Sequence, residues 1–371
     1  MLIGVPKEIK NNEFRVGLTP LSVREYVRHS HKVLVEKGAG AGIGSSDADY
    51  KSAGAEIIDT PQEIFAKADM IVKVKEPQSA ERAMLREGQI LYTYLHLAPD
   101  PDQTKDLVKS GAICIAYETV TNARGGLPLL APMSQVAGRM SVQSGAHCLE
   151  KRQGGRGMLL GGVPGVMPAK VVILGGGVVG TNAAAIAIGM GADVTIIERS
   201  VERMEELTAR FGLSVKTHYS TQGAIEEECA TADLVIGGVL IPGAAAPKLI
   251  TKAMLKHWKP GSVFVDVAID QGGCADTSHA TTHADPTYVV DGVVHYCVAN
   301  MPGGVARTST FALNNATLPF GLAIASKGWK AALKDDVHLR NGLNVAFGKV
   351  TYQAVAKDLG YDYVSAEKVL G

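Results

Sequence analysis

Residues 169–198 read AKVVILGGGVVGTNAAAIAIGMGADVTIIE, and this stretch decides the fold. The short, β-branched run at 171–174 is typical of a parallel strand that is buried on both faces. Gly175, Gly177 and Gly180 follow it as G-x-G-x-x-G. In such a loop the glycines serve a tight turn, close approach of a diphosphate and close packing of helix on strand. A small-residue helix and a second apolar run complete the β-α-β unit.

The acid that closes the second apolar run indicates the ligand. Glu198 lies at about the offset where a carboxylate accepts hydrogen bonds from the adenosine ribose hydroxyls. The diphosphate would rest on unpaired N–H groups at the helix N-terminus. A carboxylate here would repel a 2′-phosphate, so NAD is favoured over NADP. A purely structural glycine turn is the alternative, but the flanking strand, helix and acid favour a dinucleotide site.

Bulk composition excludes several classes of partner. Residues 171–192 carry no charge and are long enough for a membrane span, yet their glycines divide them into strand, turn and helix. The N-terminus is too short and polar for a signal peptide. Lys plus Arg equals Asp plus Glu at 37 each, so no global field attracts nucleic acid. We therefore expect a soluble, cytoplasmic protein with no membrane or nucleic-acid partner.

Cysteine usage points the same way. The five cysteines are dispersed and form no C-x-x-C pair. This pattern argues against a disulfide framework and against a metal site, and it suits a reducing compartment.

The N-terminal part alternates strand-like and helix-like segments, which predicts a parallel sheet with helices on both faces. Thr19, Thr60 and Asp100 precede prolines as possible helix caps. The expected strands are 2–5, 32–36, 70–74, 90–95 and 112–117, and the expected helices are 20–29, 61–67, 79–86 and 101–110.

The nucleotide unit continues beyond its first β-α-β unit, and a helix precedes it. We expect that helix at 134–152, capped by Ser134, and a helical tail from 308. Further strands are expected near 213–216, 232–237, 262–268 and 293–299. The 371 residues suffice for two domains. The prediction is an α/β protein with two doubly wound, Rossmann-like parallel-sheet domains and an interdomain cleft for the nicotinamide. Residues 129–306 would bind NAD, and 1–128 plus 307–371 would form a discontinuous substrate domain.

Polar residues stand where several strands end. Lys75 and His96 follow two apolar runs, Arg15 lies in the loop after the first strand, and Asp270 precedes a glycine pair. Ligands bind outside the carboxyl ends of strands in such sheets. Each residue has a plainer explanation: a solvated charge, a surface ion pair, a core histidine or a turn residue. Together they supply a carboxylate clamp, a cation and two acid/base candidates, which suits oxidation of an amino or hydroxy acid.

Several longer motifs extend from one end of the chain to the other, and together they resemble the alanine dehydrogenase family. They are GVPKEIKNNEFRVGLTP (4–20), VKVKEP (72–77), YLHLA (94–98), LAPMS (130–134), ILGGGVVG (173–180), DVAIDQGG (266–273) and NMPGGVARTST (300–310). The wider family includes the NAD-binding subunit of proton-translocating transhydrogenase and the lysine-forming saccharopine dehydrogenases.

The resemblance implies NAD-dependent, reversible oxidative deamination of L-alanine to pyruvate and ammonium by a homohexamer. It implies that Arg15 and Lys75 hold the substrate, that His96 is an acid/base, and that Asp270 lies beside the reacting carbon. Which of the latter two is the main base stays open. The implied cofactor contacts are Ser134, Val178, Val179, Glu198, Arg203, Ser220, Val239, Leu240, Val267, Asp270, Asn300 and Met301. Some members carry Asp where this chain has Glu198.

Two other functions compete. A related dehydrogenase could act on a larger amino acid, since one methylene changes discrimination by only ~1–3 kcal/mol. A non-catalytic NAD-binding subunit of a transhydrogenase could instead dock on a partner. Lys75, His96 and Asp270 argue against that, because a pure binding module does not need their chemistry.

Overall fold

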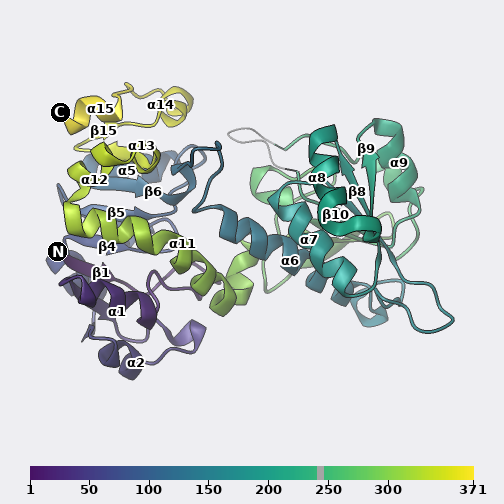
Figure 1. The fold of residues 1–371 in the computed structure, drawn as a ribbon, viewed down its shortest axis with the longest axis horizontal. Helices are drawn as coiled ribbons and strands as arrows, with labels where there is room; N and C mark the ends of the chain where they lie inside the picture. Colours follow the sequence, from purple (N-terminus) through teal and green to yellow (C-terminus); the bar gives the residue numbers. More distant parts are fainter. Residues whose placement is uncertain (240–245) are drawn as a thin grey trace. The chain divides into compact units, whose positions relative to one another are not determined.

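The chain folds into two compact α/β units. The computed structural model describes residues 1–239 and 246–371. Unit 1 comprises Met1–Met133 and Gly303–Gly371, and unit 2 comprises Ser134–Pro302. Each unit contains one mostly parallel sheet with flanking helices, which confirms the expected fold class (Figure 1).

The unit 1 sheet has eight strands in the order β15-β14-β6-β5-β4-β1-β2-β3. The parallel strands are β1 (Leu2–Val5), β2 (Lys32–Glu36), β3 (Glu56–Ile58), β4 (Met70–Val72), β5 (Ile90–Thr93) and β6 (Ile113–Ala116). Their order reverses between β1 and β4, which is the topological switch point of a doubly wound sheet. The C-terminal tail extends this sheet, because β14 (Leu343–Ala346) pairs antiparallel with β6 and β15 (Lys349–Val350) pairs with β14.

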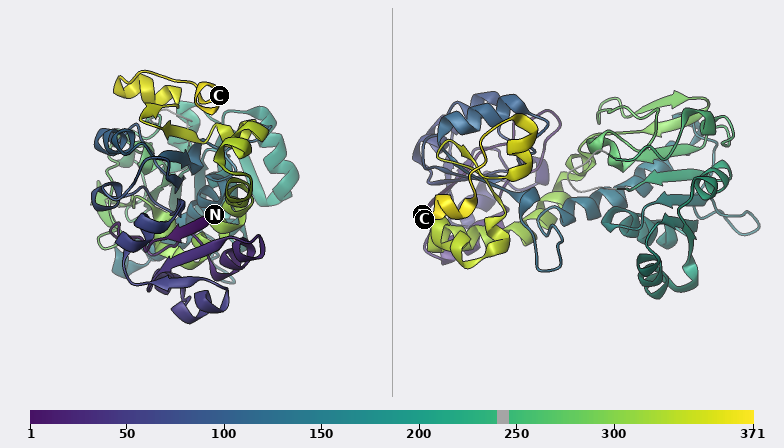
Figure 2. Two further views of the ribbon diagram at one scale, coloured as in Figure 1. Left: turned by 90° about the vertical axis from the view of Figure 1, so that its left-hand side faces the viewer. Right: turned by 90° about the horizontal axis from the view of Figure 1, so that it is seen from above.

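Helices lie on both sides of the unit 1 sheet (Figure 2). The capping predictions fare differently. The side chains of Thr19 and Asp100 accept the N–H groups of Ser22 and Gln103, as expected. Thr60 is also the N-cap residue of its helix, but its side chain makes no capping hydrogen bond. The helices are α1 (Pro20–Arg28), α2 (Asp47–Ser52), α3 (Pro61–Lys67), α4 (Ser79–Arg82), α5 (Pro101–Ser110), α11 (Ala306–Lys327), α12 (Trp329–Asp335), α13 (Val337–Arg340), α14 (Gln353–Leu359) and α15 (Ala366–Leu370).

The unit 2 sheet has seven strands in the order β12-β13-β11-β10-β7-β8-β9. Its parallel strands are β7 (Lys170–Leu174), β8 (Asp193–Glu198), β9 (Val215–Tyr219), β10 (Leu234–Gly237), β11 (Val263–Asp266) and β13 (Val293–Tyr296), and β12 (Thr287–Val290) is antiparallel at the edge. Here the order reverses between β7 and β10. The strand rich in β-branched residues, β7, therefore lies in the interior of the sheet between β10 and β8, buried as its composition predicts.

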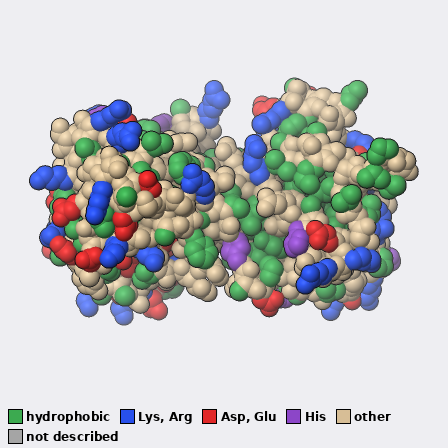
Figure 3. All heavy atoms as spheres, turned by 90° about the horizontal axis from the view of Figure 1, so that it is seen from below, with side chains coloured by type: hydrophobic (Ala, Val, Ile, Leu, Met, Phe, Trp, Pro, Cys, Tyr) green, Lys and Arg blue, Asp and Glu red, His purple; other side chains and the backbone are tan. Residues whose placement is uncertain are grey.

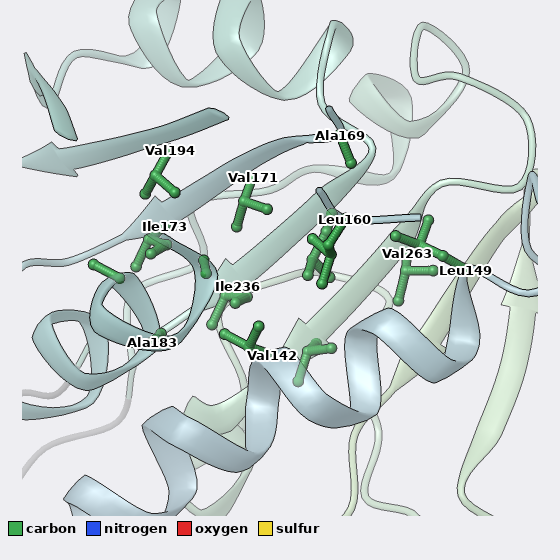
Figure 4. Packing of buried hydrophobic residues seen from close by; sticks show 14 of the residues in the cluster. Val142, Leu149, Leu160, Ala169, Val171, Ile173, Ala183, Val194, Ile236 and Val263 are labelled. Atoms are coloured by element: carbon green, nitrogen blue, oxygen red, sulfur yellow. The ribbon is translucent and has the colours of Figure 1, made fainter. Parts of the chain in front are cut away.

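The core of unit 2 forms where α6 (Ala131–Cys148) and α7 (Val178–Gly189) cover the sheet. Val142 lies close to Ile236 of β10, and Leu149 lies close to Val263 of β11 (Figure 4); all four are buried. The helix expected at 134–152 thus begins and ends earlier, and Ser134 lies in its first turn instead of capping it. Pro132 suits that first turn, because proline lacks only an N–H that would be unpaired there.

The remaining unit 2 helices are α8 (Val201–Phe211), α9 (Gln222–Ala230) and α10 (Lys252–Leu255). Basic and acidic side chains are interspersed on the face drawn in Figure 3, in keeping with a formal net charge of zero. Among the residues that the structure describes, no helix is both long and apolar enough to cross a membrane.

Candidate functional site

The glycine turn after β7 shows three different steric environments. Gly175 has φ +94, and a Cβ added at Gly180 would lie 1.9 Å from the carbonyl oxygen of Gly175. Neither position tolerates a side chain, so both glycines serve the fold itself. At Gly177, the residue that precedes α7, a Cβ would meet no protein atom within 4 Å. This open space beside a helix N-terminus fits the close approach of a diphosphate.

Glu198, the last residue of β8, is held by the backbone around it. Its Oε2 accepts the N–H of Gly176 at 2.7 Å, and its Oε1 accepts those of Arg199 at 2.6 Å and Ser200 at 3.0 Å. A carboxylate has about four lone-pair positions, so it can still accept a ribose hydroxyl. The acid is therefore fixed at the tip of β8, beside the glycine turn.

Arg203 in α8 braces the same turn. Its Nε donates to the carbonyl of Gly176 at 2.8 Å, and its Nη2 donates to Thr181 Oγ1 at 2.7 Å. Thr181 Oγ1 in turn donates to the Gly176 carbonyl at 3.0 Å. Arg203 thus joins α8 to the start of α7.

The other predicted cofactor residues come mainly from the carboxyl ends of the unit 2 strands. Ser220 follows β9 and donates its N–H to the Glu198 carbonyl at 2.9 Å. Val239 follows β10, Val267 follows β11, and Val178 and Val179 begin α7. This edge is the one where ligands bind in doubly wound sheets. Leu240 lies outside the described residues.

Ser134, Asn300 and Met301 lie in other segments of unit 2. Ser134 lies one helical turn before Gly138 of α6, where an added Cβ would be 2.2 Å from the carbonyl oxygen of Val179. The two helices are thus in close contact near the start of α7. Asn300 and Met301 follow β13. Asn300 takes the left-handed backbone conformation with φ +59, and Met301 is buried.

Asp270 lies in the short 3₁₀ helix η5 (Val267–Gln271) and is exposed. Asp266, the buried last residue of β11, was not predicted as a site residue; it accepts the N–H groups of Ala268 and Cys274 at 3.0 and 2.8 Å. The hydroxyl of Ser278 also donates to it, at 2.5 Å. Burial raises the pKa of Asp266, against the opposing effect of these hydrogen bonds. Asp266 therefore holds the loop that carries Asp270.

Three predicted site residues, two for holding the substrate and one for acid/base chemistry, follow strands of the unit 1 sheet at its carboxyl edge. Arg15 follows β1, Lys75 follows β4 and His96 follows β5, and these are neighbouring strands. The carboxyl ends of parallel strands lie at one edge of the sheet, which is where ligands bind in doubly wound sheets.

Arg15 is buried and forms a two-point ion pair with Glu13. Its Nε and Nη2 lie 2.6 and 2.5 Å from the two carboxylate oxygens, and its Nη1 lies 3.1 Å from the sulfur of Met133. Burial alone would lower the pKa of Arg15, but the hydrogen bond and charge of Glu13 outweigh it and raise that pKa. Glu13 thus keeps a buried guanidinium charged and fixes its plane. The position of Glu13, two residues before Arg15, was the sequence signal that could have identified it as the partner of Arg15.

Lys75 lies in a mixed cluster of charges. Its Nζ is 3.9 Å from Oε2 of Glu76, whose other carboxylate oxygen pairs with Lys10. Burial raises the pKa of Glu76, but the positive charges of Lys75 and Lys10 outweigh it and the net shift is downward. Glu76 therefore stays ionised beside Lys75.

Lys73, two residues earlier, was missed by the sequence analysis. It is fully buried, with Nζ 3.1 Å from Glu8 and 2.6 Å from Glu81. Glu8 also accepts the N–H of Val74 at 2.7 Å. A single lysine inside the apolar run MIVKV was the signal for this buried ion cluster. It anchors the segment that leads to Lys75.

His96 differs from the other candidates because its side chain is 42% exposed. Its backbone takes the left-handed conformation with φ +51, which is uncommon for a residue with a side chain. Its ring stacks on that of Tyr94 with centroids 5.8 Å apart.

Of the residues described here, no group of three or more His, Cys, Asp or Glu could hold a metal ion.

Known proteins with similar sequences extend these observations. Residues 4–137 match the family description "Alanine dehydrogenase/PNT, N-terminal domain", and residues 141–353 match "Alanine dehydrogenase/PNT, C-terminal domain". The chain is 61% identical to an alanine dehydrogenase of Halomonas elongata, over 100% of both chains. It is 57% identical to one of Bacillus subtilis, over 100% of this chain and 98% of the relative.

Solved structures agree with the sequence relatives. An L-alanine dehydrogenase structure superposes with a TM-score of 0.94 at 52% identity, covering 97% of this chain and 99% of the other. A transhydrogenase from Sinorhizobium meliloti superposes with a TM-score of 0.81 at 25% identity, covering 95% and 100%. The transhydrogenase is thus the more distant of the two.

Proposed function

Because this chain belongs to the alanine dehydrogenase/PNT family, we propose that it catalyses the NAD-dependent, reversible oxidative deamination of L-alanine to pyruvate and ammonium. The observation that carries this proposal is full-length identity of 61% and 57% to alanine dehydrogenases. In the forward direction, L-alanine, NAD and water yield pyruvate, ammonium, NADH and a proton.

Unit 2 would hold the cofactor. The open space at Gly177 suits a diphosphate, and the carboxylate of Glu198 suits the ribose hydroxyls. The negative charge of Glu198 would also oppose a 2′-phosphate, which supports NAD over NADP. When bound, NAD accepts a hydride from the substrate carbon. Ser134, Arg203, Ser220, Val239, Leu240, Val267, Asn300 and Met301 are proposed as further cofactor residues.

Unit 1 would hold the amino acid. Glu13 fixes the plane of the Arg15 guanidinium, and this charged group would bind the substrate carboxylate through its terminal nitrogens. The sulfur of Met133 beside Nη1 is a weak acceptor that a carboxylate would displace. Lys75 would bind the carbonyl oxygen of pyruvate. Both cations favour an anionic ligand at this edge.

Two residues are candidates for proton transfer. After the ammonium group of alanine releases a proton, loss of hydride leaves an iminium, and a water molecule then attacks its carbon. His96 or Asp270 would take a proton of that water and return it to the nitrogen, and the resulting carbinolamine would collapse to pyruvate and ammonium. Both side chains are exposed enough to exchange protons with solvent. The reaction requires the nicotinamide of the bound cofactor to meet the reacting carbon of the bound amino acid.

We also propose that the protein works in the cytoplasm as a homohexamer. One glycine- and proline-rich segment of unit 2 exposes several apolar side chains, namely Leu159, Val163, Val166 and Met167. Exposed apolar groups that gather in this way commonly mark a protein–protein interface. Native mass spectrometry would give the subunit number directly, and a monomer would contradict the proposal.

Direct measurement of NADH oxidation, with and without ammonium, tests the function and its alternatives. Purified protein should oxidise NADH with pyruvate only when ammonium is present. A panel of pyruvate, 2-oxobutyrate and glyoxylate should give the highest kcat/KM with pyruvate; higher values with 2-oxobutyrate would favour a dehydrogenase for a larger amino acid. Binding of NADH without its consumption would contradict the dehydrogenase and favour a transhydrogenase-like binding subunit.

A further inference from the structure

We propose that Glu118 is a positioning residue for His96, holding the backbone of the acid/base residue through hydrogen bonds rather than acting on substrate itself. This inference rests on the proposed function, in which His96 transfers a proton. Glu118 lies in the 3₁₀ helix η2 (Tyr117–Thr119), which directly follows β6. Since β6 pairs with β5, the loop that carries His96 lies beside it.

The carboxylate of Glu118 binds the two N–H groups that lead into the loop. Its Oε1 accepts the N–H of His96 at 2.7 Å, and both of its oxygens lie 3.2 Å from the N–H of Leu95. The side chain is only 13% exposed, so bulk water competes weakly for these bonds. Such charge-assisted bonds to backbone donors are stronger than neutral ones.

The carbonyl groups of the same loop are held from another direction. Gln103 of α5 donates to the carbonyl of Leu95 at 2.6 Å, and Thr104 donates to that of Leu97 at 3.1 Å. The loop is therefore bound on its donor side by Glu118 and on its acceptor side by α5. The ring of His96 extends from this framework toward solvent.

The backbone of His96 explains why such a clamp is needed. A left-handed φ costs a residue other than glycine about 1–2 kcal/mol. The conformation persists only where surrounding contacts impose it, and such residues cluster at functional sites. The short bond between Glu118 and the His96 N–H is a contact of that kind.

The distance to the imidazole separates positioning from direct proton relay. Nδ1 of His96 lies 4.0 Å from Glu118 Oε1, which is beyond a hydrogen bond. The stacked ring of Tyr94, whose hydroxyl donates to the Leu129 carbonyl at 2.5 Å, lies parallel to the imidazole within 9°. Glu118 therefore fixes the position of the His96 backbone, and the ring of Tyr94 limits rotation of the imidazole.

Two conservative variants distinguish a clamp from a charge effect. Glu118→Gln keeps the length of the side chain and one accepting oxygen but removes the charge. Glu118→Asp keeps the charge but shortens the side chain by one methylene. A clamp predicts that Glu118→Asp lowers kcat by about 10- to 100-fold, because misplacement by about 1 Å can cost 10²-fold. Glu118→Gln should retain kcat within about fivefold, since its amide oxygen can still accept the N–H.

Controls separate this role from general damage and from failure of the proposed function. Both variants should keep the wild-type affinity for NADH and the wild-type Tm within a few degrees, and Glu63→Gln, at a glutamate of α3 whose side chain is 43% exposed, should leave kcat unchanged. Equal kcat in wild type and Glu118→Asp, or a larger loss in Glu118→Gln than in Glu118→Asp, would overturn the positioning role. A wild-type protein that never oxidises NADH with pyruvate and ammonium would remove the proposed function, and this inference with it.

Discussion

Oε2 of Glu198 accepts the backbone N–H of Gly176 at 2.7 Å, so the acid at the end of β8 is bound to the middle of the glycine turn. The glycine turn and Glu198, which lie 22 residues apart in the sequence, are therefore joined by a direct hydrogen bond. A carboxylate held in this way presents a fixed negative charge beside the expected adenosine ribose, and its orientation does not depend on the ligand.

Replacement of this acid should change cofactor preference. Glu198→Gln keeps the size of the side chain, but loss of a charged hydrogen-bond acceptor should raise the KM for NADH by about 10-fold, equivalent to ~1.4 kcal/mol. The ratio of kcat/KM for NADH over NADPH should fall, because the repulsion of a 2′-phosphate is removed. Steady-state assays with both cofactors measure this ratio, with Glu202→Gln on the exposed face of α8 as control. An unchanged ratio would contradict the role of Glu198.

Three alanine substitutions in one segment should have three different effects. Gly180→Ala places a Cβ 1.9 Å from a carbonyl oxygen and should destabilise the fold, while Gly189→Ala meets no atom within 4 Å and should be neutral or slightly stabilising. Gly177→Ala also meets no protein atom, so Tm should stay unchanged while NADH binding weakens. Thermal unfolding and NADH fluorescence titration report the two effects separately. Wild-type NADH affinity in Gly177→Ala would argue against a diphosphate at that position.

The guanidinium of Arg15 should be needed for binding substrate more than cofactor. Arg15→Lys removes the two-point geometry that pairs with Glu13 and with a carboxylate. We expect the KM for pyruvate and for alanine to rise about 10- to 100-fold, the range that follows from losing ~1.5–3 kcal/mol of charged hydrogen bonding. The KM for NADH should change little. Arg24→Lys, on the exposed side of α1, is the matched control, and equal behaviour of both variants would contradict the role of Arg15.

Mutation of His96 should lower turnover without affecting cofactor binding. A general acid/base typically contributes ~10²- to 10⁴-fold, so His96→Ala should lower kcat by about that factor while NADH affinity is retained. Parallel assays of Asp270→Asn, as kcat against pH, would show which residue carries the ionisation that the rate depends on. Near-normal turnover of His96→Ala would exclude His96 as the base.

A buried histidine in unit 2 should make stability depend on pH. His295 is fully buried between Thr277 and Val293, and burial lowers its pKa below 6.5, with a smaller contribution from His279. Below about pH 6.5 the unfolded chain binds a proton that the folded chain does not, so stability is present above that pH and is lost as pH falls. The Tm of His295→Gln should fall less than the Tm of wild type when the pH is lowered from about 7.5 to about 5.5. Exposed His257→Gln should behave as wild type, and equal losses in all three proteins would contradict this assignment.

Local sequence signals predicted the parts of the fold that depend on local physics. The β-branched run at 171–174 is a central strand, and Gly175 and Gly180 occupy positions where only glycine fits. The caps at Thr19 and Asp100 are also confirmed. Several short elements were missed, among them β3, β14 and α2, because so few residues carry little periodicity.

The partners of the candidate residues could not be predicted in the same way. Glu118 binds His96 across 22 positions, and Asp266 binds the Ser278 hydroxyl across 12. No local pattern marks a carboxylate as the partner of a backbone N–H in a neighbouring loop, since parallel pairing of strands brings the two together. The left-handed conformation of His96 likewise depends on those tertiary contacts and not on its own side chain.

The central claim is that this protein joins ammonium to pyruvate at the expense of NADH, and isotope labelling tests it most directly. Wild-type enzyme supplied with pyruvate, NADH and ¹⁵N-ammonium should form ¹⁵N-labelled L-alanine in a one-to-one ratio with the NADH oxidised. NADH oxidation that yields no labelled alanine would contradict the claim. So would the absence of NADH oxidation when ammonium is saturating.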